Sequence, residues 1–275
     1  MQHVGQAPPP VFRAELELAL AAARAGAEVV RAGFGMPLTR KEKGGADFAT
    51  SVDVESEQAM AAVLSAAKLG HGILAEEAGW VEGGPDSPSM WLIDPLCGTV
   101  NFAMGVPLFS VNVSLQEHGQ TAVGVMMNPL TDEAFWAIRG DGAYVISPSG
   151  KTEHLTSGRS SGLLAVDGGG GADEPSKVLW DIALRLEASR AFRVRVMGTT
   201  LFYAYIARGS LAGGVFKVLP QLEWAVHHAP GLLLCEEAGC VVTDLDGTPR
   251  TPESGYALIG ADRKTHGEML RLIAT

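Results

Sequence analysis

The sequence predicts an α/β protein with an α+β N-terminal half and an α/β C-terminal half. Three observations support this expectation. Two alanine-rich stretches near the start of the chain carry apolar residues at helical spacing. Short runs of alternating apolar and polar residues follow between positions 110 and 144, as in an antiparallel sheet. Beyond position 161, short apolar runs alternate with helical patterns, which is typical of α/β architecture.

The N-terminal half begins with a tail, Met1–Pro10, that ends in prolines and is expected to be disordered. Phe12–Phe34 is predicted to form a helix, because its apolar residues recur at helical spacing and Gly33 and Gly35 are stop signals. Asp53–Leu69 repeats the pattern. We expect these two helices to pack together over a sheet.

A meander of short strands is predicted from Ser110 to Tyr144. Turns at Glu117-His118-Gly119 and Asn128-Pro129 separate neighbouring runs, so the strands should be antiparallel. The runs are Val111–Leu115, Thr121–Val125 and Ala134–Ile138.

The C-terminal half is expected to follow a polar linker, Ser147–Ser161. Gly168–Gly171 lacks the Lys-Ser/Thr spacing of a phosphate-binding loop, so we expect a flexible loop there. The elements expected in chain order are strand Leu163–Val166, helix Pro175–Ser189, strand Phe192–Val196, helix Thr199–Ala207, strand Val215–Val218, helix Ala225–Ala238, strand Cys240–Thr243, strand Ala257–Gly260 and helix Lys264–Ala274.

Composition is typical of a globular enzyme, because 275 residues with 47% hydrophobic content can bury a sizeable core. A net charge of −10 argues against nucleic acid or an anionic membrane as partner, although bound cations would still admit a phosphate ester. Three cysteines without paired spacing or a signal peptide indicate a reducing compartment, and we expect the cytoplasm. No apolar run approaches the roughly 20 residues needed to cross a bilayer.

The segment Trp91–Phe102 brings a carboxylate, a thiol and a hydroxyl into one tight turn after an apolar strand. Its Asp-Pro and Gly-Thr steps predict that Asp94 and Thr99 lie on an exposed loop, where side chains can reach a ligand. Gly98 would let backbone N–H groups approach an anion. With Cys97 between them, these residues predict a metal and phosphate site with one unusual ligand.

Upstream, a short apolar strand ends in the paired carboxylates Glu76 and Glu77. Such a pair alone is more often a solvated charge pair than a metal site. Here a loop rich in Gly, Pro and Ser connects it to the strand that ends in Asp-Pro-Leu-Cys-Gly-Thr. The combination is far more specific than either motif.

Together the motifs resemble the Gly-Glu-Glu and Asp-Pro-Ile/Leu-Asp-Gly-Thr signatures of the inositol monophosphatase family, with Ala75 in place of the glycine and Cys97 in place of the second aspartate. The resemblance implies a layered αβαβα sandwich and a metal-dependent hydrolase of a small phosphate monoester, without an organic cofactor. It also implies a homodimer. Residues 11–146 and 147–275 would form the two halves of one compact unit, with the site between them.

Further matches extend over almost the whole chain. Lys41–Asp53 resembles the family's mobile loop, and by that resemblance Asp53 helps to orient the attacking water or an extra metal. An ordinary role as helix N-cap is equally open to this residue. Thr99 is likewise placed to orient a water. Met197–Thr200 resembles the Gly-Thr/Ser step that opens a helix lining the substrate pocket, although Thr199 could be merely a cap.

The family's Trp-Asp motif in the C-terminal third is altered. Counting back from Glu237–Cys240 puts His227 at the position of the metal-binding Asp. Aligning on Trp224 puts Ala225 there instead, with Glu223 as the nearby carboxylate. Neither alignment restores the Asp.

By the resemblance, the first metal ion is held by Glu76, Asp94 and the Leu96 carbonyl, and the second by Asp94, Cys97 and His227. Magnesium suits the first set of oxygen ligands. Because a hard cation prefers oxygen to thiolate or imidazole, we expect zinc or manganese at the second site if it is occupied. The residues expected to contact the substrate are Gly98, Thr99, Gly198, Thr199 and Lys217. Lys217 lies near the place of the family's acidic, sugar-contacting residue, which argues against a polyol.

Three interpretations of Cys97 and His227 stay open. With Asp94 they are a plausible zinc set. Alternatively, a thiol beside a base generates a nucleophilic thiolate, which would give a non-phosphatase chemistry. The third interpretation is that the second site is lost, leaving a weak enzyme or a noncatalytic binding protein.

The remaining cysteines and histidines are expected to be structural or solvated. Cys235 and Cys240 lie in apolar contexts and are predicted to be core thiols. His228 is expected to pack at the helix start, or else to act as a second base beside His227. The histidines expected to be solvated are His71, His118, His154 and His266.

Overall fold

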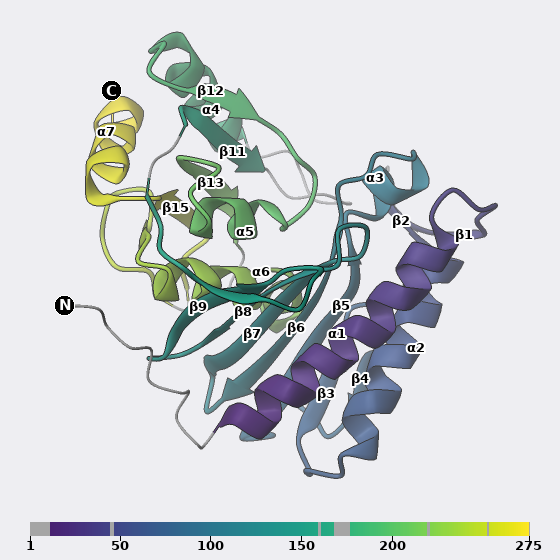
Figure 1. Ribbon diagram of the computed structural model, residues 1–275. Helices are drawn as coiled ribbons and strands as arrows, with labels where there is room; N and C mark the ends of the chain where they lie inside the picture. Colours follow the sequence, from purple (N-terminus) through teal and green to yellow (C-terminus); the bar gives the residue numbers. More distant parts are fainter. Residues whose placement is uncertain are drawn as a thin grey trace.

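Helices and sheets alternate in the order helix pair, sheet, helix pair, sheet, helix pair (Figure 1). This computed structural model describes residues 12–44, 47–158, 161–167, 177–218, 221–251 and 253–274, except the side chains of residues 44, 47 and 223. The expected tail Met1–Pro10 and glycine loop Gly168–Gly171 lie outside these residues. The layer order confirms the αβαβα sandwich.

The larger sheet has, within the described residues, eight strands in the spatial order β10-β9-β8-β7-β6-β5-β3-β4. They are β3 (Gly72–Ala75), β4 (Gly79–Glu82), β5 (Ser89–Cys97), β6 (Ser110–Glu117), β7 (Gln120–Asn128), β8 (Glu133–Ile138), β9 (Gly142–Ile146) and β10 (Thr152–Leu155). Antiparallel pairing of β6, β7 and β8 confirms the expected meander. β3 instead runs parallel to β5, with Ala75 opposite Ile93. The next residues, Glu76 and Asp94, therefore emerge at one edge of the sheet.

Two long helices, α1 (Arg13–Gly33) and α2 (Ser51–Ala66), pack together over one face of this sheet. Their alanine-rich faces allow close approach. At Gly26 of α1, an added Cβ would come within 2.7 Å of the Met60 sulfur on α2. The expected packing of two N-terminal helices over a sheet is confirmed.

A hairpin of β1 (Arg40–Gly44) and β2 (Asp47–Thr50) leads into α2. Thr50 is the N-cap, and its Oγ1 accepts a hydrogen bond from Val52 N at 3.2 Å. Asp53 is the third helical residue and completes the capping box through Thr50 N, 2.8 Å from its Oδ2. The expectation that Asp53 is itself the N-cap is wrong, because the helix begins earlier.

The smaller sheet has, within the described residues, five strands in the order β12-β11-β13-β15-β14. They are β11 (Leu163–Asp167), β12 (Arg193–Arg195), β13 (Gly213–Lys217), β14 (Val241–Thr243) and β15 (Tyr256–Gly260). Between the two sheets lie α5 (Phe202–Ala207) and α6 (Leu222–Glu237), and α4 (Lys177–Ala188) and α7 (Arg263–Ile273) cover the outer face. α6 contacts strands of both sheets, so it joins the two halves of the molecule.

Some local expectations are wrong. The predicted linker Ser147–Ser161 contains β10, which pairs with β9. Most of β10 is exposed, so it lacks the apolar alternation by which a strand is recognised. The strands β1, β2, β4 and β9 and the helix α3 (Thr99–Ala103) were not expected either. His266 is buried rather than solvated, because α7 turns its Nε2 toward Thr243 Oγ1 at 2.8 Å.

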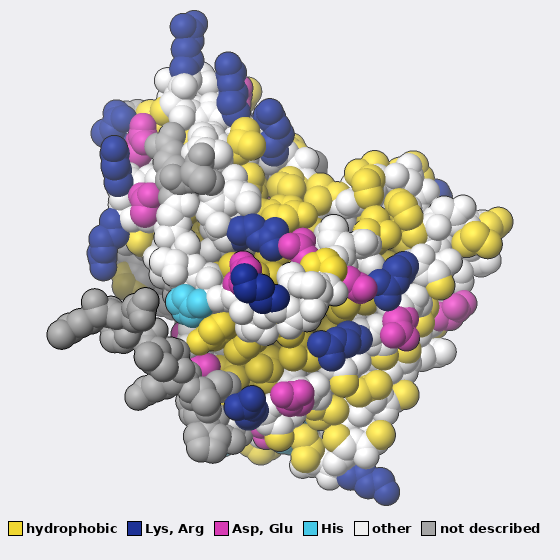
Figure 2. All heavy atoms as spheres, viewed as in Figure 1, with side chains coloured by type: hydrophobic (Ala, Val, Ile, Leu, Met, Phe, Trp, Pro, Cys, Tyr) yellow, Lys and Arg dark blue, Asp and Glu magenta, His cyan; other side chains and the backbone are white. Residues whose placement is uncertain are grey.

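The surface is hollowed between the side that carries α4 and β12 and the side that carries α3 (Figure 2). Lys and Arg side chains gather over α4 and β12 at the upper left, where Arg185, Arg190, Arg193 and Arg195 are exposed. α3 directly follows β5 in the chain. Among the described residues, no helix combines the length and apolarity needed to span a membrane.

Candidate active site

The end of β5 places Asp94 inside the molecule. β5 continues through the Asp-Pro step to Cys97, with irregular pairing to β6 between the two residues. Asp94 is fully buried, and its Oδ1 accepts a hydrogen bond from Leu96 N at 3.2 Å. The expectation that Asp94 lies on an exposed loop is wrong, because the backbone stays in the sheet where the Asp-Pro step suggested a turn.

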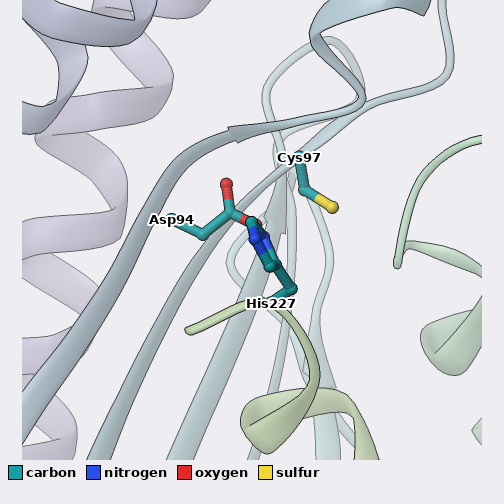
Figure 3. Close-up of side chains that lie close together, drawn as sticks. All are labelled: Asp94, Cys97 and His227. Carbon is teal, nitrogen blue, oxygen red and sulfur yellow. The ribbon is translucent and has the colours of Figure 1, made fainter. Parts of the chain in front are cut away.

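Cys97 and His227 converge on Asp94 (Figure 3). The possible ligand atoms of the three side chains, one from each, all lie within 4.8 Å of one another. His227 comes from α6, and its Nδ1 is 2.8 Å from Asp94 Oδ2. This contact supports the alignment that gives His227, rather than Ala225, the place of the family's Asp. The Glu223 side chain lies outside the described part of the chain.

A buried hydrogen-bond network orients Cys97. Its sulfur accepts from Thr200 N at 3.2 Å and from Thr200 Oγ1 at 2.9 Å. Asn112 Nδ2 in turn donates to Thr200 Oγ1 at 2.9 Å and to Asp94 Oδ2 at 3.2 Å. Ser110 Oγ donates to Asn112 Oδ1 at 3.1 Å. The thiol and the carboxylate are therefore held by the same amide.

The electrostatics favour an ion pair between His227 and Asp94 over a thiolate at Cys97. Burial, with the Asp94 charge adding to it, raises the pKa of Cys97 to about 11. Burial alone would lower the pKa of His227, but the charges of Glu76 and Asp94 outweigh it and raise that pKa well above its ordinary value. Cys97 and His227 do lie close enough to share a hydrogen bond, which lowers the pKa of Cys97, but burial outweighs it. The side chains of a nucleophile and base pair are thus brought together, while the electrostatics favour a neutral thiol over a thiolate.

Glu76 and Glu77 follow β3 in a turn that two other elements hold. Glu57 on α2 accepts hydrogen bonds from the backbone N–H of Glu77 at 2.7 Å and of the next residue at 3.0 Å. Lys43 on β1 lies 3.0 Å from Glu76 Oε1 and also contacts the Glu77 carboxylate. Burial, with the Asp94 charge adding to it, raises the pKa of Glu76 to about 8. Lys43 thus supplies positive charge to both carboxylates at this edge.

Asp53 and Thr99 meet beside this edge. Asp53 is fully buried, and its Oδ1 lies 2.8 Å from Thr99 Oγ1. Thr99 Oγ1 also lies 3.0 Å from the Leu96 carbonyl oxygen, and its single proton serves one of these acceptors at a time. Burial raises the pKa of Asp53, against the hydrogen bonds from Thr50. Both residues proposed to orient a water are therefore in direct contact.

The expected substrate-binding steps lie against each other. At Gly98, whose φ is +106°, an added Cβ would be 3.2 Å from both Gly198 O and Thr199 Cβ. Asn101 Nδ2 lies 2.7 Å from Met197 O and 3.3 Å from Gly198 O, which ties the two loops together. Thr199 Oγ1 donates to the Cys97 carbonyl at 3.0 Å and accepts from Leu201 N at 3.2 Å. Thr199 thus links the two loops but does not cap a helix, because α5 begins at Phe202 with Leu201 as its N-cap.

Lys217 lies at the end of β13, with its ammonium 5.6 Å from the centroid of the Trp224 ring. Trp224 in the first turn of α6 stacks on His228, at 5.8 Å between ring centroids and 2° between planes. His228 is buried, and its Nδ1 lies 2.9 Å from Tyr203 Oη. Burial, with the nearby positive charge of His227, lowers the pKa of His228 to about 3. His228 therefore packs as a neutral ring rather than serving as a base.

The donor atoms fit metal ions of two kinds. Glu76, Asp94 and the Leu96 carbonyl offer only oxygens, and burial, together with the Asp94 charge, raises the pKa of Glu76, so a bound cation would favour its charged form. Asp94, Cys97 and His227 offer oxygen, sulfur and nitrogen within 4.8 Å, which is a zinc-type set with one position left open. The short contact between His227 and Asp94 would open to admit an ion.

Several residues that shape the site escaped the sequence interpretation: Lys43, Glu57, Asn101, Asn112 and Thr200. Asn112 did carry a signal. It lies on β6, where its neighbours Val111 and Val113 point to the opposite face of the sheet and belong to the hydrophobic core. The face that carries Asn112 is polar and yet fully buried. A buried amide in a strand covered on both faces needs partners.

Known proteins resemble this chain in sequence and in structure. A family model described as the inositol monophosphatase family matches residues 13–275. The chain is 31% identical over 256 residues to the inositol-1-monophosphatase of Caulobacter vibrioides, covering 90% of this chain and 96% of the relative. It is 32% identical over 253 residues to a protein named Nus factor SuhB from Pasteurella multocida, covering 90% and 91%.

Among solved structures, the extragenic suppressor protein suhB of Bartonella henselae superposes with a TM-score of 0.80 at 26% identity, covering 94% of this chain and 98% of that one. An IMPase of Thermotoga maritima, at 24% identity, shares the fold with a TM-score of 0.79 over 95% and 97% of the two chains. Members of the matched family are phosphatases that act on small phosphorylated substrates and are typically metal dependent. The match over residues 13–275, the layered fold and the convergence at Asp94 together show that the chain belongs to the inositol monophosphatase family.

Proposed function

We propose that this protein is a metal-dependent hydrolase of a small phosphate monoester whose second metal site is built from Asp94, Cys97 and His227. One observation carries the proposal: these three side chains, from β5 and α6, present oxygen, sulfur and nitrogen within 4.8 Å of one another. Two chance replacements of carboxylates would leave a lysine or an apolar side chain as readily as two zinc-ligand types. Their convergence on the shared Asp94 favours a working site.

Different residues of the chain would orient the attacking water and bind the phosphate. Bound divalent ions would neutralise phosphate charge and lower the pKa of a bound water. Thr99, bonded to Asp53, holds a hydroxyl that can accept a hydrogen bond from a water and so orient it, since a hydroxyl that donates to a carboxylate is a stronger acceptor. Gly98 has a positive φ and no side chain, so the backbone of the Gly-Thr step can approach a phosphate oxygen. Asn101 fixes that step against the Gly198 loop.

Magnesium is the ion we propose for the first set, and zinc or manganese for the second. The first set has only oxygen donors, whereas the second contains a thiol and an imidazole. The Cys97 thiol would have to lose its proton to bind, so occupancy should fall as pH falls. Lys217 lies beside Trp224 in the first turn of α6. Its positive charge favours an anionic group on the substrate, whereas the acidic residue of the family would bind an uncharged polyol.

A noncatalytic binding role is the second candidate. Some relatives of comparable similarity are named Nus factor SuhB, which is not an enzyme name. The exchange of two carboxylate ligands for Cys97 and His227 would also weaken magnesium catalysis, because charge stabilisation at the leaving oxygen is typically worth several kcal/mol. This candidate predicts no turnover with any metal.

The test measures bound metal and turnover on the same samples. The protein is first stripped of metal with a chelator and then reloaded with magnesium, manganese or zinc. Each sample is analysed for metal content. The same samples are assayed for phosphate release from inositol 1-phosphate, fructose 1,6-bisphosphate and p-nitrophenyl phosphate. We expect turnover of at least one ester to require zinc or manganese, and zinc to give anomalous scattering between Asp94, Cys97 and His227 in crystals.

Two double variants provide the contrast. C97D with H227D should raise magnesium-supported hydrolysis by about tenfold or more, because it restores hard ligands. The matched control, C97A with H227A, should lose zinc without gaining magnesium activity. Full wild-type turnover in magnesium alone, unchanged by the aspartate pair, would rule out the altered site. Stoichiometric zinc with no turnover of any ester would favour the binding role.

A further inference from the structure

The C-terminal end of α6 brings two cysteines together, about two helical turns beyond His227. The backbone there forms a Schellman motif: Gly239 N donates to Glu236 O at 3.0 Å, and Cys240 N donates to Cys235 O at 3.0 Å. Gly239 supplies the left-handed residue, with a φ of +88°. In this motif the side chain of the residue after the glycine usually packs on the residue five positions earlier. Here both residues are cysteines.

The backbone hydrogen bond limits how far apart the two cysteines can be. With a donor–acceptor distance of 3.0 Å, standard bond lengths keep the Cα atoms of Cys235 and Cys240 within about 7 Å. Disulfides bridge Cα atoms about 4.4–6.8 Å apart. The pair therefore meets the main geometric condition for a cross-link without unwinding of the helix.

The two thiols differ in accessibility. Cys235 is fully buried, and its sulfur lies 3.5 Å from the Tyr203 carbonyl oxygen. Cys240 is partly exposed, because it follows the helix and begins the approach to β14. A reagent from solution thus meets Cys240 first. An oxidised Cys240 would find Cys235 beside it as a resolving thiol.

We propose that Cys235 and Cys240 form a redox-active dithiol that a hydroperoxide converts to an intramolecular disulfide. The Cys240 thiolate attacks one peroxide oxygen, the O–O bond breaks, and Cys240 becomes a sulfenic acid while the other oxygen leaves as hydroxide and takes up the proton lost from the thiol. The Cys235 sulfur then attacks the Cys240 sulfur, the S–O bond breaks, and water leaves with the Cys235 proton. Two thiols lose two electrons and one peroxide gains them.

The protonation equilibria agree with these roles. A hydrogen bond from the Cys235 thiol lowers the pKa of Cys240, against the effect of burial, and a Ser157 hydrogen bond adds to the lowering. Burial, together with that same bond, raises the pKa of Cys235 well above the ordinary value. Reactive cysteines of redox sensors are accessible, have lowered pKa values and lie beside a resolving cysteine. Cys97, whose pKa is raised to about 11, lacks these features and serves as an internal comparison.

A disulfide between Cys235 and Cys240 would affect the segments that contact the C-terminal end of α6. Ser157 N donates to Ala238 O at 2.8 Å, and the Glu237 carboxylate accepts from Gly140 N at 2.8 Å and Gly142 N at 3.0 Å. The end of α6 is therefore fastened to the turn between β8 and β9 and to the segment after β10. A disulfide across Gly239 would tighten this junction.

The experiment treats reduced wild-type protein, at low concentration, with a small excess of hydrogen peroxide and then blocks remaining thiols with iodoacetamide. We expect the intact mass before blocking to fall by two hydrogen atoms. After blocking, the peptide map should show Cys235 linked to Cys240 and Cys97 alkylated. A small dithiol reductant should restore both thiols. Before peroxide, Cys240 should alkylate at least about tenfold faster than Cys97 or Cys235 at neutral pH.

Two variants separate the roles. In C235A the sulfenic acid at Cys240 has no resolving partner, so dimedone should trap it. In C240S peroxide should leave Cys235 as a thiol, because the accessible sulfur is gone. If wild-type protein keeps both thiols under peroxide, or goes directly to a sulfinic acid at Cys240 without a disulfide, the proposal is overturned whatever the variants do. Since neither cysteine belongs to the candidate active site, this outcome is independent of the proposed hydrolase.

Discussion

At the scale of single residues, the contact between Thr99 and Asp53 makes a sharp prediction for catalysis. T99A should lower kcat by about 10²-fold or more, because it removes the hydroxyl proposed to orient the attacking water. T99S keeps that hydroxyl and should retain most of the activity. Initial rates with the best ester and metal would be compared at equal metal occupancy.

Metal content separates this role from a structural one. Thr99 is proposed to act on water rather than as a ligand, so T99A should hold as much metal as the wild-type protein. Loss of metal in T99A, or equal kcat in T99A and T99S, would contradict the assignment.

A second residue-scale prediction concerns His266 and pH. Burial lowers the pKa of His266 below its ordinary value of 6.5, so the folded protein binds a proton there less readily than the unfolded chain. The stabilising effect is complete above about pH 6.5 and is lost as pH falls toward the lower folded pKa, by up to about 1.4 kcal/mol per pH unit.

H266Q keeps a polar group for the Thr243 hydroxyl but does not titrate. Its free energy of unfolding in urea should therefore fall less steeply than that of the wild-type protein between pH 6.5 and 4.5. H118Q changes an exposed histidine and is the matched control. Parallel slopes for wild-type protein and H266Q would show that the buried ring does not resist protonation.

At the scale of elements, helix α2 supports the metal edge from behind. Glu57 on this helix accepts two backbone hydrogen bonds from the turn that carries Glu76. E57A should lower the free energy of unfolding by about 1–3 kcal/mol, because two part-buried backbone donors lose a charged acceptor. It should also weaken magnesium binding, since the turn that presents Glu76 is no longer held.

The exposed Glu55 on the same helix provides the control, and E55A should change neither quantity. Urea unfolding and magnesium titration by calorimetry measure the two effects. A fully stable E57A with wild-type magnesium affinity would show that the turn holds itself.

Elements with strong local periodicity could be predicted from the sequence, and those that depend on distant partners could not. The helices over Phe12–Phe34 and Asp53–Leu69 were found because one apolar face repeats along each. β10 was missed because it is mostly exposed and lies at the edge of the sheet, where β9 is its partner among the described residues. Its polar sequence resembles that of a linker.

The same distinction between local and distant partners applies to the residues of the candidate site. The motif at Asp94 pointed to a metal ligand, but its burial depends on His227, which lies 133 positions away, and on Asn112, 18 positions away. Local pattern carries no information on such partners. The pairing of Lys43 with Glu76, 33 positions away, was missed for the same reason.

At the scale of the whole molecule, metal binding should be linked to global stability. The proposed ligands come from β3, β5 and α6, and α6 lies between the two sheets. An ion that binds only the folded protein stabilises it, by about 2.7 kcal/mol at a free concentration one hundred times Kd. Zinc should therefore raise the melting temperature of chelator-treated protein.

D94N removes the charge that both proposed ion sets share, so its melting temperature should not respond to zinc. D86N, which changes an exposed carboxylate, should respond like the wild-type protein. A zinc shift that survives in D94N would place the binding elsewhere in the chain.

The division into residues 11–146 and 147–275 and the homodimer stay predictions. β10, at residues 152–155, belongs to the larger sheet, so separate expression of a piece ending at residue 146 would remove one of its edge strands. Sedimentation velocity over a concentration series tests the homodimer directly.

The hydrogen bonds that end on Cys97 also determine which replacements its position accepts. Donation runs in one direction, from Ser110 to Asn112, from Asn112 to Thr200 and from Thr200 to the sulfur. Each donor hydrogen in this series already has its acceptor, so the side chain at position 97 must accept the hydrogen bond from Thr200. A thiol and a carboxylate both meet that requirement, whereas an ammonium group would face two donors. Replacement of Cys97 by aspartate would therefore keep these hydrogen bonds satisfied, so this half of the proposed ligand change needs no redesign of the core around it.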